Sequence, residues 1–468
     1  MKSKPYEKII LISLDTLRAD CIPSNPNKLY KNKYQLDIEI EDSILNQISK
    51  SGFFFNNAVS VAPYTSASHA AYFTGKWPKN NGLYDQFNSK LRNDVKTIFK
   101  LLNENGYETI FKTDFPFILG KYLNLIKGVD KYFIEDDNAA LSSIKKNKKQ
   151  LVFFHFGQIH YPYGFHNLKY GGEDYVKKLN QLEKKYKIKT NEISLEDMAI
   201  ESFRSDKDIE MLFRYKKIIS HLYKNRRDSE LFNLYIEGIN YFNKKKLNGF
   251  LSKLIDLLNK ENYLIVIFAD HGEAWNDSAY GHHNSLDEDV LRVPIIFYSK
   301  DIKPKTYGNR IRTIDLAPTI ADILGIKADY DGKSLKDIIY SDIVEEDREA
   351  FSAIWVNESN AVIKQIKSLL KKDKISFNKS KSIKYGASVY KNNFRYVEYY
   401  KKFANRSEEL INHNSEALYK NGELVRKKDS KVLKGLKARI STLNNINTQS
   451  NISPEEIKSY LRLQGYKV

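Results

Sequence analysis

The sequence predicts an α/β fold, in which helices cover both faces of a parallel sheet. Four apolar runs have the length and composition of buried parallel strands: Ile9–Leu14, Leu151–Phe156, Tyr263–Ala269 and Val293–Tyr298. Helical patterns, such as ISLEDMAIESF and LNGFLSKLIDLLNKE, lie between them. Because strands alternate with helices along the chain, a layered α/β architecture is expected.

Polar residues follow three of these runs at the point where each strand is expected to end. Asp15 comes directly after the first run, Gln158 and His160 follow the second, and the tetrapeptide DHGE (270–273) follows the third. Ligands of open α/β sheets bind outside the carboxyl ends of the strands. We therefore expect these carboxylates and imidazoles to meet at one edge of the sheet and to form a functional site.

The chain has 468 residues, more than one hydrophobic core usually supports, so a large domain with a smaller one is expected. We assign residues 1–342 to an α/β domain and residues 343–468 to a C-terminal subdomain of short strands and terminal helices. Within the α/β domain, a charged helical segment at about 167–231 is expected to be an insertion between two strands. It contains the capping pattern Ser194-x-x-Asp197.

The C-terminal subdomain carries two local signals. The stretch ASVYKNNFRYVEYY (387–400) predicts a β-hairpin that turns at Asn392-Asn393. After a polar, asparagine-rich linker, Ser453-Pro454 is expected to begin a final helix, with proline at its first position.

Composition limits the classes of function. A hydrophobic content of 41% and an aromatic content of 13% are typical of a globular protein. The formal charge of +18 comes mainly from scattered lysines, so solvated faces explain it without a nucleic acid or an anionic lipid as partner. The single cysteine, Cys21, excludes an intrachain disulfide and a cysteine-based zinc cluster. No apolar run has the length of a signal peptide or a membrane span, so we expect a cytoplasmic protein without a membrane anchor.

The stretch VAPYTSASHAAYFTGKWPKNNG (61–82) places several hydroxyls close to an imidazole. Part of it is expected to form a short helix that begins near Ser66 to Ser68 and ends at Gly75. A hydroxyl at a helix N-terminus and near a metal can be activated as a nucleophile, because the helix dipole favours an incoming anion. Residue types alone leave the choice among Thr65, Ser66 and Ser68 open, and Thr65 or Ser66 could instead serve only as the N-cap.

Asp15, Asp270 and His271 together suggest a metal site. A carboxylate and an imidazole at the end of one buried strand, with a second carboxylate from another, suit a divalent cation with oxygen and nitrogen ligands. Such a cation lowers the pKa of a bound hydroxyl and neutralises a transferring oxyanion. Either aspartate alone could simply cap the segment that follows it, but the set of three favours a metal.

Eight motifs follow one another along the chain: ISLDTLRAD (12–20), SGFFFNNAVSVAPYTSASHAAYFTGKWPKNNG (51–82), NGYET (105–109), QIHYPY (158–163), IFADHGE (267–273), LRVPIIFY (291–298), IDLAPTIADILGI (314–326) and DGKSL (331–335). In this order they resemble the sulfatase-like family of the alkaline phosphatase superfamily, and the resemblance covers residues 8 to about 340. It implies an alkaline-phosphatase-like three-layer sandwich with a large, mostly parallel central sheet.

The resemblance singles out Thr65 as the nucleophile. Sulfatases carry a Cys or Ser, converted to formylglycine, ten residues before the glycine that corresponds to Gly75, and this position is Thr65 here. The block TSASH (65–69) resembles the T-x-P-S-H variant, in which an unmodified Thr attacks phosphorus, although Ala67 replaces the proline. Threonine cannot become formylglycine, and His69 stands where sulfatases use Arg. The resemblance thus implies phosphoryl chemistry at Thr65, with His69 supporting the site.

The same resemblance implies one divalent metal ion, held by Asp15, Thr65, Asp270 and His271. His271 stands where the calcium site of sulfatases often has Asn, and imidazole suits Mn or Zn better than Ca. The two-zinc phosphodiesterases of the superfamily carry a D-x-x-G-H pattern after the second strand, whereas this chain reads FGQIHYPYGFH there.

Three further histidines become candidates through the resemblance. His160 matches the family's HxPY histidine and is expected to contact the transferred group, although it could also only cap the aromatic turn. Aligning on Leu286 and the LRVP that follows places His282 at the leaving-group position, and the adjacent His283 is an alternative. A histidine there can protonate a departing alkoxide or stabilise its charge.

Two other segments bear on the site. Arg18 and Asp20, in the family's LRxD pattern, are expected to form an ion pair that positions the Asp15 loop. The segment GYETIFKTD (106–114) lacks the Gly-Lys pair that sulfatases tend to show.

These motifs favour a metal-dependent hydrolase or transferase that acts on a phosphate ester through Thr65 and a covalent phosphothreonine. The expected substrate is a small-molecule, sugar-linked or nucleotide-linked phosphate ester. The alternatives are a sulfate ester hydrolase that works without formylglycine, a two-metal phosphodiesterase, and a catalytically silent basic binding protein of the same fold. No motif encodes the individual substrate or the oligomeric state.

Overall fold

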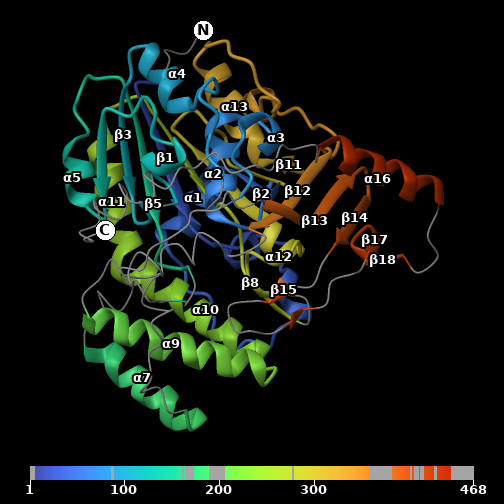
Figure 1. Cartoon of the computed structure of the whole chain (residues 1–468). Helices are drawn as coiled ribbons and strands as arrows, with labels where there is room; N and C mark the ends of the chain where they lie inside the picture. Colours follow the sequence, from blue (N-terminus) through green and yellow to red (C-terminus); the bar gives the residue numbers. More distant parts are fainter. Residues whose placement is uncertain are drawn as a thin grey trace, which may run out of the picture.

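The structure, a computed structural model, describes residues 6–85, 89–116, 118–160, 163, 173–188, 206–276, 279–357, 382–400, 403–404, 410–411, 416–425 and 430–443. Its centre is a nine-stranded sheet in the order β10-β2-β9-β6-β1-β5-β3-β4, with β11 paired to β2 (Figure 1). The strands are β1 (Lys8–Leu14), β2 (Phe53–Val59), β3 (Glu108–Thr113), β4 (Lys131–Ile134), β5 (Gln150–Phe156), β6 (Tyr263–Phe268), β9 (Arg292–Tyr298), β10 (Lys305–Tyr307) and β11 (Ile311–Arg312). All four predicted apolar runs are strands of this sheet, and the α/β fold class is confirmed.

Most neighbouring strands of the sheet run parallel, but β9 does not. β1 pairs in parallel with both β5 and β6. β9 runs antiparallel to β6 and β2, so the expectation that Val293–Tyr298 belongs to the parallel set was wrong. Among its described residues, the connection from β6 holds only a small hairpin (β7, Ala274–Asn276; β8, Ala279–Gly281) and the short α12 (Glu288–Leu291). A parallel return would need a crossover of a dozen or more residues, usually a helix, and apolar periodicity carries no information on strand direction.

Helices lie on both faces of the sheet because alternate residues of its strands point to opposite sides. Phe153 of β5 packs edge-on against Phe73, whereas Phe154 and Phe156 pack against Phe250. Phe73 belongs to α2 and Phe250 to α11. The helices of these two layers are α1 (Ile44–Ser51), α2 (Thr65–Thr74), α3 (Pro78–Asn81), α4 (Ile98–Glu104), α5 (Asp137–Ser142), α11 (Asn248–Leu258), α13 (Leu316–Ile323) and α14 (Lys336–Tyr340).

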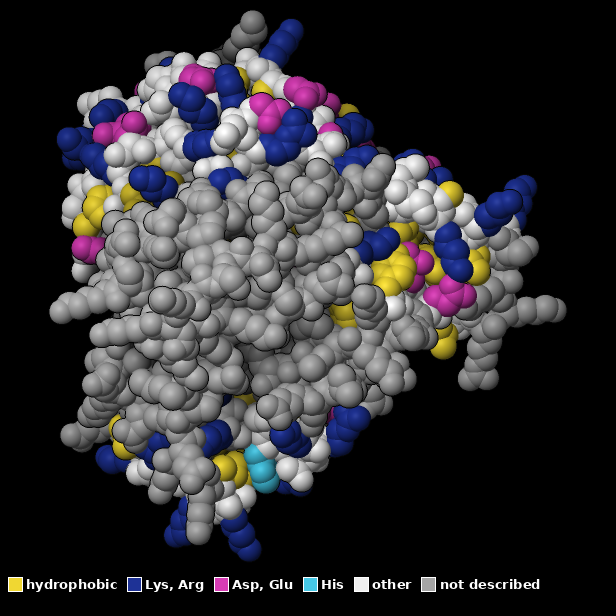
Figure 2. Space-filling model, in the orientation of Figure 1, with side chains coloured by type: hydrophobic (Ala, Val, Ile, Leu, Met, Phe, Trp, Pro, Cys, Tyr) yellow, Lys and Arg dark blue, Asp and Glu magenta, His cyan; other side chains and the backbone are white. Residues whose placement is uncertain are grey.

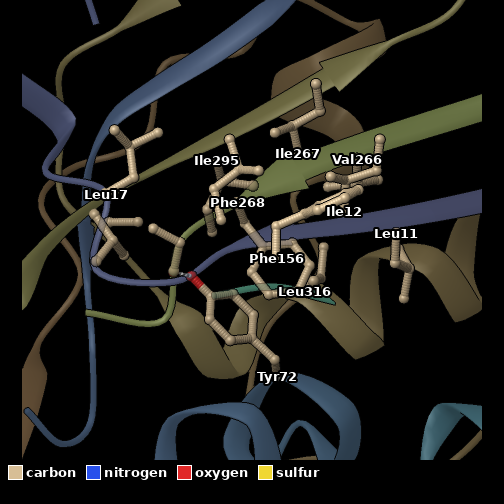
Figure 3. Close-up of a cluster of buried hydrophobic side chains, with 14 of the residues drawn as sticks. Leu11, Ile12, Leu17, Tyr72, Phe156, Val266, Ile267, Phe268, Ile295 and Leu316 are labelled. Atoms are coloured by element: carbon tan, nitrogen blue, oxygen red, sulfur yellow. Dashed lines mark hydrogen bonds between the residues drawn. The ribbon is translucent and has the colours of Figure 1, made fainter. Parts of the chain in front are cut away.

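The buried core between the sheet and α2 is continuous with the carboxyl ends of the central strands. Figure 3 shows side chains of β1, β6 and β9 gathered beside Tyr72 of α2. The Tyr72 ring lies 4.3 Å from that of Phe268, and its hydroxyl donates to Ala269 O at 2.8 Å. The core thus fixes the end of β6 directly before the DHGE segment.

Part of the chain between β5 and β6 lies at the lower edge of Figure 1, where its described residues form α7 (Glu173–Tyr186), α9 (Asp206–Lys224) and α10 (Asp228–Phe242). A π-helix (Asn243–Leu247) joins α10 directly to α11. The predicted capping pattern Ser194-x-x-Asp197 lies outside the described residues.

A separate antiparallel sheet, formed by residues of the C-terminal part of the chain, lies at the right of Figure 1. Its order is β12-β13-β14-β17-β18, and it carries helix α16; the bounds are β12 (Ala350–Asn357), β13 (Ser382–Lys391), β14 (Phe394–Tyr399), β17 (Glu416–Lys420), β18 (Glu423–Leu424) and α16 (Ser430–Leu443). The predicted hairpin is confirmed: β13 and β14 pair antiparallel across Asn392-Asn393, and Asn392 has a left-handed φ of 51°. The final helix expected from Ser453-Pro454 lies outside the described residues.

Surface charge is dispersed. On the face shown in Figure 2, Lys and Arg side chains lie at several separate places, interspersed with acidic side chains. Ion pairs such as Lys76–Asp329 (2.6 Å) and Arg439–Glu349 (2.6 Å) account for part of this charge. Within the described chain, no helix is both long and apolar enough to cross a membrane.

Candidate active site

Four side chains converge at the carboxyl edge of the sheet. Asp15 follows β1, Asp270 and His271 follow the neighbouring β6, and Thr65 opens α2. One ligand atom from each of Asp15, Asp270 and His271 lies within 4.8 Å of the others. The Thr65 hydroxyl lies 3.4 Å from Asp15 Oδ2 and 3.5 Å from His271 Nε2. All four residues are at most 1% exposed, so they form one compact buried group, called the metal cluster below.

Helix α2 begins at Thr65, slightly earlier than the sequence suggested, and its N-cap is Tyr64. Neither Thr65 nor Ser66 is therefore the N-cap. The Tyr64 hydroxyl donates to Tyr84 O at 2.5 Å and accepts from the amide of Trp355 in β12. The first-turn amides of a helix have no partner within it, so this N-terminus favours an anion beside the Thr65 hydroxyl. The helix ends, as expected, at a left-handed glycine, Gly75 (φ 61°).

The donor atoms of the metal cluster fit a divalent cation. Nδ1 of His271 lies 3.0 Å from Gly272 O, to which it can only donate, so Nε2 carries a lone pair toward the carboxylates. Nε2 lies 3.5 Å from Asp270 Oδ2 and 3.8 Å from Asp15 Oδ1. Both of these oxygens are buried and have no hydrogen-bond partner among the described residues. Unpaired buried carboxylate oxygens are costly unless a cation binds them, and an imidazole ligand suits Mn or Zn.

The pKa shifts of Asp15 and Asp270 also favour a bound cation. Burial, with the nearby charge of Asp270, raises the pKa of Asp15 well above its ordinary value. Burial also opposes ionisation of Asp270, but the imidazoles of His271, His69 and His155 outweigh it and hold the pKa of Asp270 below its usual range. Without a cation the pair therefore tends to keep one proton. A divalent cation would replace that proton, because it stabilises both charges.

A layer of polar side chains lies beneath the metal cluster, and sequence reasoning found only part of it. His69, one turn after Thr65, lies 2.8 Å from Thr65 O through Nδ1 and 2.8 Å from Ser13 Oγ through Nε2. Ser13 pairs in register with His155, whose Nε2 lies 3.1 Å from Asp15 Oδ2. His69 thus lies behind the Thr65 backbone, within the core. His155 was missed, although a histidine inside the apolar run LVFFHF was the available signal.

Burial lowers the pKa of both His69 and His155 to about 4, so both imidazoles are neutral at physiological pH. His155 can then donate Nε2–H to the Asp15 carboxylate, which fixes the orientation of that carboxylate. Such outer hydrogen bonds orient metal ligands and tune their basicity.

The Asp15 loop is held in a strained conformation. Thr16, a β-branched residue, has a left-handed φ of 61°, and its amide donates to Asp270 Oδ1 at 3.2 Å. The hydroxyl of Tyr235, on α10, donates to Thr16 O at 2.7 Å and accepts from the amide of Arg18. Helix α10 therefore supports the metal cluster, a role that no sequence motif indicated.

The predicted Arg18–Asp20 ion pair is present and buried. The Arg18 guanidinium donates to both oxygens of Asp20, at 2.9 and 2.8 Å, and also lies 3.3 Å from Asp289. A third hydrogen bond, to Glu273 O at 3.0 Å, ties the loop after β1 to the loop after β6. The pair therefore joins the two segments that carry the carboxylates of the metal cluster.

The remaining predicted histidines form a second group, called the imidazole cluster below. The His282 ring centroid lies 4.4 Å from that of His271, 4.8 Å from that of His160 and 4.3 Å from that of His283. His282 Nδ1 lies 2.9 Å from Glu273 Oε1. Of the adjacent pair, His282 is thus the residue that lies beside both the metal cluster and His160.

His283 takes a different position. Its backbone is left-handed (φ 57°), its amide donates to Pro63 O at 2.9 Å, and its ring stacks on Tyr64 with centroids 6.0 Å apart. It therefore lies over the turn that leads into Thr65.

The segment that lacks the sulfatase Gly-Lys pair places its own lysine inside the molecule. Lys112 is fully buried and pairs with Asp114 and Asp137, each at 2.6 Å. Asp114 also accepts from the Gln158 side chain at 2.9 Å. The charge of Lys112 is therefore compensated by Asp114 and Asp137 inside the molecule.

The fold and the site together define the class: an α/β domain with a buried Asp/Asp/His group beside a hydroxyl at a helix N-terminus. The sulfatase family model matches residues 7–326, and the chain belongs to the sulfatase family.

The relatives of this chain include both a sulfatase and a phosphopentomutase. The chain is 23% identical over 320 residues to an ulvan-active sulfatase of Formosa agariphila, covering 66% of this chain and 54% of the relative. It is 29% identical over 140 residues to a phosphopentomutase of Helicobacter pylori, covering 30% of each chain. The chain thus spans about half the length of the first relative and less than a third of the second.

Solved structures show the same fold along nearly the whole chain. A structure determined in complex with its substrate D-glucosamine-2-N,6-O-disulfate has a TM-score of 0.61 at 15% identity, covering 98% of this chain and 99% of that one. A phosphonate monoester hydrolase of Silicibacter pomeroyi has a TM-score of 0.53 at 15% identity, covering 93% and 94%.

Proposed function

We propose that this chain is a metal-dependent hydrolase or transferase that acts on a phosphate ester with Thr65 as nucleophile. The observation that carries the proposal is the place of the Thr65 hydroxyl, which lies at the N-terminus of α2 and 3.4–3.5 Å from Asp15 and His271. A threonine carries no route to formylglycine, so the hydroxyl itself has to attack.

Asp15, Asp270, His271 and Thr65 would hold one divalent cation. When bound, it would lower the pKa of the Thr65 hydroxyl and offset the charge of the transferred group. The protein supplies the rest of the chemistry. The Thr65 hydroxyl gives up its proton to water as Oγ1 forms a bond to phosphorus. The ester P–O bond breaks with its electron pair on the departing oxygen, and the His282 imidazolium gives that oxygen its Nε2 proton. Water, or an acceptor alcohol, then resolves the phosphothreonine.

The charge of the site favours a monoanionic ester. Within the described residues, Thr65, Asp270 and His271 contact carboxylates and imidazoles but neither an ammonium nor a guanidinium group. The nearest buried cations, Arg18 and Lys112, are paired with aspartates. One divalent cation, held beside the Asp15 and Asp270 carboxylates, balances a single negative charge more readily than the two of a phosphate monoester. A phosphate diester therefore fits this site best.

A sulfate ester is the second candidate, because it is also monoanionic and because the relatives with the longest matches are sulfatases. An unmodified threonine would then attack sulfur.

A substrate panel separates these functions. Purified protein, reconstituted with Mn or Zn, would be assayed on p-nitrophenyl phosphate, bis-p-nitrophenyl phosphate, p-nitrophenyl phenylphosphonate and p-nitrophenyl sulfate. We expect the diester to give the highest kcat/KM. Acid-quenched enzyme should carry a phosphoryl group on the peptide that contains Thr65, as measured by mass spectrometry. Preferred turnover of the sulfate would support the second candidate, and no turnover of any ester would contradict both.

A further inference from the structure

A chain of buried hydrogen bonds holds His282 through its Nδ1. The indole Nε1 of Trp275 donates to the hydroxyl of Tyr163 at 2.8 Å. The Tyr163 hydroxyl is hydrogen-bonded to Glu273, whose Oε1 and Oε2 lie 2.9 and 3.1 Å from His282 Nδ1. Trp275, Tyr163 and Glu273 are at most 1% exposed, and His282 is 4% exposed. All four members are therefore shielded from water.

The donor inventory of the side chains fixes the direction of each bond. An indole N–H can only donate, so the Tyr163 hydroxyl accepts from Trp275 and gives its one proton to Glu273. Burial and the nearby Asp15 raise the pKa of Glu273, while the hydrogen bond from Tyr163 and the charge of Arg18 oppose that rise. Against the His282 imidazolium, whose Nδ1–H can only donate, the Glu273 carboxylate is the acceptor. The His282 ring therefore carries a proton on Nδ1, and Nε2 is the ring atom that can interact with a ligand.

The backbone is shaped to allow this contact. Gly281, directly before His282, has a φ of 77°, and a Cβ at this position would lie 2.9 Å from Glu273 Oε1. The Glu273 carboxylate thus occupies the space that a side chain at position 281 would need. The His282 ring also lies close to the rings of His271 and His160, with centroids 4.4 and 4.8 Å away.

We propose that Glu273 and Tyr163 are positioning residues for the leaving-group step, and that they hold His282 so that Nε2 meets the departing oxygen. This inference rests on the proposed function. The Thr65 hydroxyl loses its proton to water as the bond from Oγ1 to phosphorus forms, and the ester P–O bond breaks with its electron pair on the departing oxygen. That oxygen takes the Nε2 proton of the imidazolium, and Nδ1–H stays on Glu273, so the ring ends neutral.

A series of leaving groups tests the inference. Aryl esters of the class that the wild-type enzyme turns over would be compared, from p-nitrophenyl to the poorer leaving group phenyl, for wild type, Glu273→Gln and Tyr163→Phe. Glu273→Gln keeps the size of the side chain but removes its charge. We expect the loss of kcat/KM to be at least about ten times larger for the phenyl ester than for the p-nitrophenyl ester, with metal content unchanged. An equal loss for both esters, or loss of the metal, would overturn the proposal.

Tyr107→Phe is the matched control for Tyr163→Phe. Tyr107 is also buried, and its hydroxyl donates to Tyr6 O at 2.6 Å, at the opposite end of the sheet. Tyr163→Phe loses two buried hydrogen bonds and Tyr107→Phe loses one, so both variants should lose thermal stability, Tyr163→Phe the more. Only Tyr163→Phe should change the leaving-group dependence, and the same change in Tyr107→Phe would contradict the proposal.

A second measurement does not depend on activity. In the zinc-loaded protein with ¹⁵N-labelled histidine, the resonances assigned to His282 by their loss in His282→Asn should show a protonated Nδ1. A proton on Nε2 alone would overturn the proposal even if the enzyme is active. If no ester is turned over, the proposed function is wrong. The spectrum still decides whether the hydrogen-bond chain keeps a proton on Nδ1 of His282.

Discussion

The metal cluster and the imidazole cluster adjoin each other, but they are built in different ways. Asp15, Asp270 and His271 follow two paired strands directly, so the ladder between β1 and β6 sets their spacing. His160 and His282 lie in connections between strands, and side-chain contacts such as that of His282 with Glu273 hold them in place. Strand ends give precise positions with few supporting residues, whereas loop residues need a supporting network.

This difference predicts that changes in the metal cluster stop the reaction, while changes in the imidazole cluster alter its dependence on substrate.

The largest effect is expected for Thr65→Ala, which removes the attacking oxygen. Turnover should fall by about 10⁴-fold or more. Ser66→Ala is the matched control, because the Ser66 hydroxyl lies in the same helical turn, is buried and has no hydrogen-bond partner in the described part of the chain. Steady-state kinetics of the two variants on one ester would show the contrast, and equal activities would remove Thr65 from the mechanism.

The second largest effect is expected for Asp270→Asn, because this change removes one of the carboxylates that would bind the cation. We expect metal affinity to fall by at least about 100-fold. The measurement is the metal content per chain after dialysis against a chelator, with His282→Asn as the comparison. Equal retention of metal by both variants would contradict the division into two clusters.

His282→Asn should affect the leaving-group step alone. Turnover of phenyl esters should fall by about 10²- to 10⁴-fold, with a smaller loss for p-nitrophenyl esters, which depart without a proton. His160→Asn and His283→Asn, measured on the same esters, would show which histidine acts. A steeper dependence for His283→Asn would transfer the role to that residue.

The layer beneath the metal cluster predicts a dependence of stability on pH. His69 and His155 have a pKa of about 4 in the folded chain, below the ordinary 6.5 of histidine. Between these values the unfolded chain binds more protons than the folded one, so the free energy of unfolding should decrease as the pH falls from 6.5 to 4. The loss is on the order of 3 kcal/mol per histidine. Urea titrations of the metal-free protein would measure it, and His155→Gln should show a shallower dependence than wild type.

The smallest effect is expected for Tyr235→Phe on α10. It removes the hydrogen bonds to Thr16 O and from the Arg18 amide, at a cost of about 1–2 kcal/mol in the free energy of unfolding. Turnover should fall modestly, because the Asp15 loop becomes less firmly held. A change in the leaving-group dependence of this variant would show that α10 acts on the imidazole cluster instead.

The sequence by itself determined the fold class and the edge of the sheet at which the site lies. Apolar runs report burial, and the residue after each run is fixed by its neighbours along the chain, so Asp15 and Asp270 could be placed at strand ends. The family-like spacing to Gly75 separated Thr65 from Ser66 and Ser68.

Only the tertiary structure decided the direction of β9, the contact of His155 with Asp15, the support of Thr16 by Tyr235, and the choice of His282 as the histidine beside Glu273. The pairs that form these polar contacts, apart from His282 and Glu273, are more than 100 residues apart in the chain. Their contacts arise when strands pair and helices pack, so no local pattern of residue types encodes them. The contact of His282 with Glu273 spans only nine residues, but it depends on the left-handed turn at Gly281 and on the packing of Tyr163 and Trp275.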